Sequence, residues 1–253
     1  MYSVHNILFD MDFGVNDGGV FTATPVDVLH ALRKGVLEYI IKEFVKTLDP
    51  GCRAYLYDFF KNMCKHQKQR SKDWFPRTSF YDGITNVKKL TGQDIFGICF
   101  TSLLCLLTLS DEWKLKFGTL LAIKSGVNSY VTALSLWTQL FEKLLILDSW
   151  CRKEDGMWSC NLTTSNRMKR LFHQKLEDVM VSISRICPRE DGLGWKIIKF
   201  HELMHLTEYI QLYGSPANYN TGFCESITNG FQRIQPKIPK GSNPSLRNRL
   251  RTG

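Results

Sequence analysis

The stretch TPVDVLHALRKGVLEYIIKEFVKTLDPG, residues 24–51, predicts a long amphipathic helix near the start of the chain. Its apolar residues recur every three or four positions from Leu29 to Val45, which places them on one helix face. Thr24, Pro25 and Asp27 are typical of a helix N-terminus, as a cap, a first-position proline and a first-turn acid. The DPG at residues 49–51 predicts the end of this helix.

The same periodicity continues through most of the chain. Further helices are expected over residues 54–69, from about residue 93 through the apolar stretch to 109, over 165–186 and over 195–213. Two or three more are expected between residues 113 and 150, with bends at Gly118 and at Ser125-Gly126. These patterns predict a mainly α fold.

We expect four parts along the chain. Residues 1–23 are an irregular lead-in, 24–192 a helical region, 193–231 a C-terminal core segment, and 232–253 a basic tail. Beyond Glu225 the chain has no acidic residue, and its basic residues stand among prolines, glycines and serines. Such a composition cannot bury enough apolar surface to fold, so we expect the tail to be flexible.

Charge and composition limit the classes of partner. The chain has 253 residues, of which 43% are hydrophobic, and a formal net charge of +9. A protein of this size can bury a substantial core, and its positive charge favours polyanions such as nucleic acid. We therefore expect DNA as a partner, and self-association is an open alternative. The longest apolar run, residues 95–109, is short of the roughly 20 residues that a membrane helix needs, so no membrane is expected.

The cysteines indicate a reducing compartment. None of the eight forms a C-x-x-C pair, and a chain of 253 residues does not depend on disulfides for a core. Asp10, Asp12 and Asp17 stand where a signal peptide would be basic and then apolar. We expect a nuclear or cytoplasmic protein that is not secreted.

Two basic clusters are candidate contacts to phosphate groups. One lies in and after the second expected helix, and the other lies in the tail. The residues are Lys61, Lys65, Lys68, Arg70, Lys72, Arg247, Arg249 and Arg251. Solvated helix faces are often equally basic, so these residues also fit an ordinary surface.

The segment KFHELMH, residues 199–205, contains an H-E-x-x-H pattern. On a helix, His201 and His205 would lie one turn apart as zinc ligands, with Glu202 as general base and Glu225 or Glu208 as third ligand. The charged Lys199 and the polar Thr207 are atypical of a buried catalytic helix. The alternative is a pair of histidines on a half-buried amphipathic helix.

Four stretches together resemble RNase H-like, DDE-type transposases of Plavaka-like and related eukaryotic elements. They follow one another along the chain in the family's order, and their collinearity carries the resemblance. They are DFG (12–14) with ATP (23–25); DVLH (27–30) with GVL (35–37); PRTSF (76–80) with DGIT (82–85) and LTG (90–92); and 199–205 continuing through GSPANYNTG (214–222) to Glu225.

The resemblance implies a small RNase H-like α/β core remnant interrupted by a large helical insertion. It maps Asp27 and His30 onto the family's D-x-x-H signature and Glu225 onto the third catalytic acid. In the complete enzymes three acids hold two Mg²⁺ or Mn²⁺ ions for DNA strand cleavage and transfer. The first two acids of the family lie upstream of D-x-x-H, and no residue here matches them. The resemblance thus implies a C-terminal portion, truncated in its gene model or decayed in the genome, that is inactive alone.

Two other functions remain open from the sequence. One is the zinc metallopeptidase read from H-E-x-x-H, with Zn²⁺ at His201 and His205. The other is a non-enzymatic DNA-binding or scaffolding remnant, in which the helices and basic tail persist without cleavage. It predicts binding that weakens steeply with salt and has little sequence preference.

Overall fold

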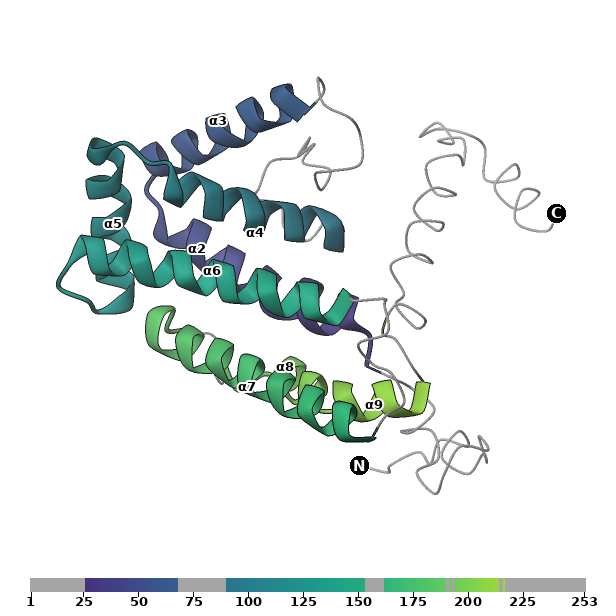
Figure 1. Ribbon diagram of the computed structural model, residues 1–253. Coiled ribbons are helices and arrows are strands. Elements are labelled where there is room, and N and C mark those ends of the chain that lie inside the picture. Colours follow the sequence, from purple (N-terminus) through teal and green to yellow (C-terminus); the bar gives the residue numbers. More distant parts are fainter. Residues whose placement is uncertain are drawn as a thin grey trace, which may run out of the picture. The chain divides into compact units, whose positions relative to one another are not determined.

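In the computed structural model, the described residues are 26–67, 90–152, 162–189, 192, 194–213 and 216 (Figure 1). Side chains are not described at 64–67, 152, 162–165 and 213. The chain divides into two units, Met1–Asn220 and Thr221–Gly253, and every described residue belongs to the first. The expected lead-in and basic tail lie outside the described residues.

The described part of the chain is mainly helical, as expected, and contains no strand. Its elements are η2 (Leu29–Leu37), a π-helix, and the α-helices α2 (Glu38–Thr47), α3 (Pro50–Gln67), α4 (Gly92–Leu107), α5 (Asp111–Ser125), α6 (Tyr130–Arg152), α7 (Leu162–Ile186), α8 (Ile198–Met204) and α9 (Leu206–Tyr213).

The first helical segment starts later than its sequence predicts. Val26 and Asp27 are not helical, so the expected start at Pro25 is wrong by three residues. Asp27 is the cap instead: its Oδ1 accepts from the Leu29 N–H at 2.9 Å, and its carbonyl accepts from the Ala31 N–H at 2.8 Å. A side-chain acceptor at this place satisfies a backbone donor that has no partner within the helix. Asp27 therefore sets the start of η2 and α2.

The middle of the chain forms α3, α4 and the pair α5–α6. The proline that was expected to stop the first helix also begins α3, since Pro is favoured at a first helical position. At α4, Thr91 and Asp94 form a capping box. Gly126, with φ of 64°, ends α5 in the left-handed conformation that glycine adopts without strain. The expected bend at Gly118 is absent, because α5 is continuous there.

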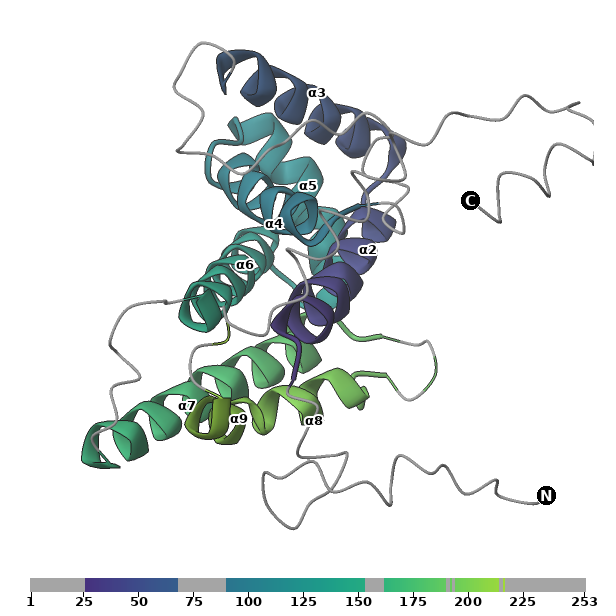
Figure 2. The same ribbon diagram turned by 90° about the vertical axis from the view of Figure 1, so that its right-hand side faces the viewer.

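Helix α6 lies at the centre of the packing. It contacts α4, α5, α7 and η2, and both views show it between α4 on one side and α7 on the other (Figures 1 and 2). Trp137 and Phe141 of α6 are fully buried against Phe44 of α2, with ring centroids 5.4 and 5.1 Å from that of Phe44. Rings at these separations add specific contacts to the burial of apolar area.

The C-terminal described segment is divided where one helix was expected. The sequence predicted a single helix over residues 195–213, but α8 ends at Met204 and α9 begins at Leu206. His173 of α7 occupies the break, because its Nε2–H donates to the Met204 carbonyl at 2.9 Å. A helix end in a packed region requires such a partner for its last carbonyl groups.

The five cysteines whose side chains are described, at positions 52, 99, 105, 151 and 187, are buried free thiols. Burial is the main cause that raises the pKa of Cys52, Cys105 and Cys187 to about 12 each. Such thiols pack as small apolar side chains. Within the described residues, no helix is long and apolar enough to span a bilayer.

Candidate functional site

Most of the sequence-predicted site residues lie outside the described part of the chain. This holds for Glu225, the proposed third acid, for the tail arginines, and for the side chains of the first basic cluster beyond residue 63. Lys61 is described, and it is exposed on α3. The two histidine motifs are fully described and can be compared in detail.

Asp27 and His30 form a hydrogen-bonded pair at the N-terminus of η2. The His30 Nδ1–H donates to Asp27 Oδ2 at 2.5 Å, while Oδ1 of the same carboxylate caps the helix. The His30 side chain is half exposed. Both Asp27 oxygens therefore have protein donors, so Asp27 fits an orienting role for His30 better than a direct metal ligand.

His201 and His205 lie close together, as the H-E-x-x-H pattern predicts. Their ring centroids are 4.8 Å apart, although His205 is at the break between α8 and α9. Glu202, the general base of the peptidase interpretation, accepts from Lys199 Nζ at 3.0 Å. Among the described residues, no group of three or more histidine, cysteine or acidic side chains is placed to hold a metal ion.

Glu208 links the histidine pair to α7. It accepts from His205 Nδ1–H at 2.9 Å and from Lys169 Nζ at 3.4 Å. The hydrogen bond from His205, followed by the bond and charge of Lys169, lowers the pKa of Glu208. His205 Nδ1 carries the proton that Glu208 accepts, so this hydrogen bond orients the His205 ring.

The two motif-bearing segments pack against each other although nearly 170 residues separate them in sequence. Helices η2 and α8 are in contact, and Gly35 lies against Lys199 in this contact. A Cβ at Gly35 would lie 3.0 Å from Lys199 Cγ and 2.8 Å from the His30 carbonyl oxygen. The absence of a side chain at Gly35 allows this packing.

Sequence reasoning missed a buried ion pair beside this contact. Arg33 of η2 donates through Nε to Asp148 of α6 at 2.6 Å and through Nη2 at 3.1 Å, and both side chains are almost fully buried. The Arg33 guanidinium also lies 5.2 Å from the Phe96 ring centroid. Asp148 interrupts the apolar face of α6, but its partner, 115 residues away, has no local signal.

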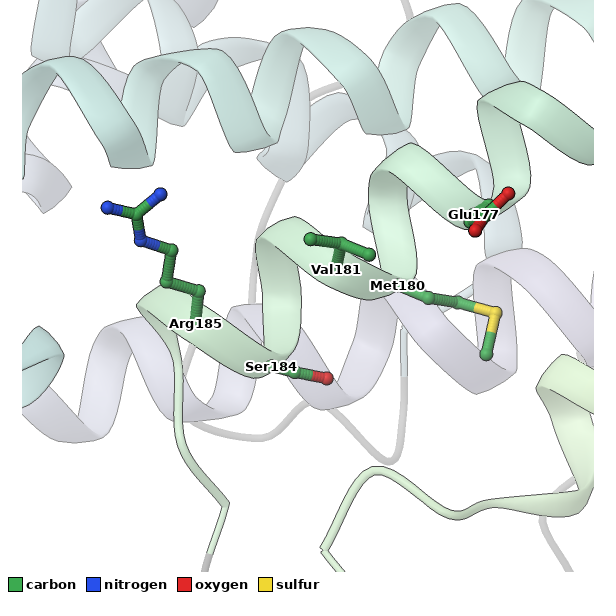
Figure 3. A pocket seen from close by; sticks show the side chains of 5 residues that line it. All are labelled: Glu177, Met180, Val181, Ser184 and Arg185. Carbon is green, nitrogen blue, oxygen red and sulfur yellow. The ribbon is translucent and has the colours of Figure 1, made fainter.

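The surface depression on α7 is shallow and open. Its lining residues are Glu177, Met180, Val181, Ser184 and Arg185, and Figure 3 shows all five on this one helix. A ligand-binding cavity normally buries most of its ligand between several elements. This depression therefore has the shape of an ordinary helix surface.

The chain was also compared with known proteins. No family model, curated protein or solved structure gave a match.

Proposed function

We propose that this chain is the DNA-binding helical part of a transposase-like protein with an RNase H-like core remnant. In this proposal Glu225 is the third metal-binding acid, for Mg²⁺ or Mn²⁺, and Asp27 and His30 are the signature pair. Cleavage requires two further acids of the family pattern, so the chain alone binds DNA without cutting it.

The contact between η2 and α8 is the observation that supports the proposal most. A large insertion into a core leaves the segments before and after it side by side. Here the D-x-x-H segment and the segment leading to Glu225 meet at Gly35 and Lys199. The helices α3 to α7 lie between them in sequence, as the insertion interpretation expects.

The electrostatics of the chain are consistent with a DNA ligand. The net charge of +9 attracts a polyanion over the distances that ionic screening permits. Contacts to phosphate release counterions, and binding therefore weakens steeply as salt increases. Such contacts position a protein on the duplex without reading its sequence.

The first test measures binding of the full chain to a fluorescent DNA duplex by anisotropy over a series of salt concentrations. We expect binding at low salt, a steep loss with added salt, and similar affinities for unrelated sequences. Failure of the wild-type chain to bind duplex DNA at low salt would contradict the proposal.

The second test concerns Glu225. A form of the protein that carries the family's two further acids is expected to nick supercoiled plasmid in Mn²⁺, and Glu225→Gln is expected to abolish nicking. Gln keeps the size of the side chain but removes the anionic ligand. DNA binding by the variant should be unchanged, which separates metal chemistry from misfolding. Nicking that persists in Glu225→Gln would exclude Glu225 as the third acid.

The zinc metallopeptidase is a second candidate, favoured by the 4.8 Å separation of the His201 and His205 rings. The rings are neighbours, but among the described residues no third ligand is placed with them to hold a metal ion. Elemental mass spectrometry of wild-type and His201→Ala protein tests this candidate. One zinc per chain, lost in the variant, would support the metallopeptidase, and wild-type protein without zinc would exclude it.

A further inference from the structure

The N-terminal part of α7 is basic and has no acidic residue. Residues 162–176 contain Arg167, Lys169, Arg170, His173 and Lys175, while Glu177 and Asp178 begin the next turn. Arg167 and Arg170 are exposed and lie three positions apart, so their side chains are neighbours on one helix face. Two like charges at this spacing repel each other, and an anionic ligand would remove that repulsion.

Several other described cations have a carboxylate beside them. Lys42 pairs with Glu38, Lys116 with Glu112, and Lys124 with Glu43. Arg167 and Arg170 have no such partner within the described part of the chain. Their positive charge is therefore not neutralised by the described residues.

The polar side chains next to these arginines already have partners among the described residues. Lys169 and His173, on the same stretch of α7, contact Glu208 and the Met204 carbonyl at 3.4 and 2.9 Å. Glu208 accepts hydrogen bonds from both Lys169 and His205. We call the surface formed by Arg167 and Arg170, which are exposed on one face of α7, the α7 basic surface.

We propose that the α7 basic surface binds the phosphodiester backbone of double-stranded DNA, an inference that rests on the proposed function. Guanidinium groups donate paired hydrogen bonds to phosphate oxygens, so Arg167 and Arg170 are the main contacts. Glu177 and Asp178 repel phosphate and bound the surface along α7. An anionic membrane fits less well, because the exposed large apolar side chain on the described part of α7, Val181, lies beyond these acids.

The test uses the full chain, a fluorescent duplex of about 20 base pairs, and the double variant Arg167→Gln/Arg170→Gln. We expect affinity at low salt to fall about tenfold or more and the slope of log affinity against log salt to decrease by about two. Arg185→Gln is the matched control, since Arg185 is exposed on the same helix but beyond Glu177 and Asp178. The control should change affinity less than about twofold, and circular dichroism should show equal helix content.

The outcomes separate this inference from the proposed function. If wild-type protein binds DNA and the double variant binds equally well, the α7 basic surface is not the contact, while the proposed function stands. If wild-type protein does not bind DNA, the proposed function fails, and the inference fails with it. Vesicles containing phosphatidylserine provide the last comparison: loss of vesicle binding but not of DNA binding in the double variant would overturn the assignment to DNA.

Discussion

A charged pair is buried among the helices around α6, whereas a similar pair is exposed to solvent on the surface of α7 to α9. Around α6, Arg33 and Asp148 lie in the core with side-chain exposures of 5% and 0%. On the outer side, His205 and Glu208 have side-chain exposures of 45% and 50%. Each pair joins a carboxylate to a nitrogen donor within hydrogen-bonding distance. The two pairs differ greatly in the exposure of their side chains to solvent.

This difference separates structural charges from charges that are available to a ligand. A buried pair has lost its hydration, so removing one partner leaves the other charge without compensation. An exposed pair is screened by water and contributes little to stability, but its members can exchange partners. We therefore place the candidate DNA contacts on α7 and assign a structural role to Arg33 and Asp148.

The largest expected effect on stability is at the buried pair of Arg33 and Asp148. Asp148→Ala leaves the Arg33 guanidinium buried without a carboxylate, and we expect the free energy of unfolding to fall by about 3–5 kcal/mol. Chemical denaturation followed by circular dichroism measures the change. Glu112→Ala, which removes an exposed partner of Lys116, is the control and should leave the free energy of unfolding nearly unchanged.

Replacing both members of the buried pair tests the same prediction more directly. Arg33→Met with Asp148→Leu replaces both charges by apolar side chains, and we expect it to recover most of the stability lost in Asp148→Ala. An Asp148→Ala variant as stable as the Glu112→Ala control would contradict the structural role of the pair. It would also remove the distinction between buried and exposed charges on which the comparison depends.

A smaller effect is expected at the contact between α5 and α6. A Cβ at Gly118 would lie 2.7 Å from the Tyr130 carbonyl oxygen and 2.9 Å from Tyr130 Cβ, so backbone must move. We expect Gly118→Ala to lower the free energy of unfolding by about 1–3 kcal/mol, measured as above. Gly51→Ala is the control, because its added Cβ would only reach 3.4 Å from Asp49 Oδ1. A stabilised Gly118→Ala variant would exclude this tight packing.

Periodicity predicted the helices well, because most of the helices bury one apolar face. The expected helix over 165–186 corresponds to α7, and the expected start near residue 93 corresponds to α4. Gly118 was misread as a bend, because a glycine in a helix can signal either a bend or a close contact. The contact partner, Tyr130, is known only after α5 and α6 are packed.

The candidate site was less predictable than the fold. The H-E-x-x-H pattern indicated that His201 and His205 are neighbours, which the 4.8 Å ring separation confirms. The pattern did not predict the break at His205, because His173, the side chain that caps α8, comes from another helix. Long-range partners of this kind depend on tertiary packing and leave no local pattern in the sequence.

The smallest predicted effect on stability concerns Glu208, which belongs to the exposed pair with His205. Its pKa in the folded protein is lowered, chiefly by the hydrogen bond from His205. Its contribution to stability is therefore fully present above the pKa of the unfolded state and is lost as pH falls through the lower folded-state pKa. Because Glu208 is half exposed, we expect Glu208→Gln to cost less than about 1 kcal/mol at neutral pH. The wild-type and variant unfolding energies should converge on acidification, and a difference that grows instead would contradict the role of this bond.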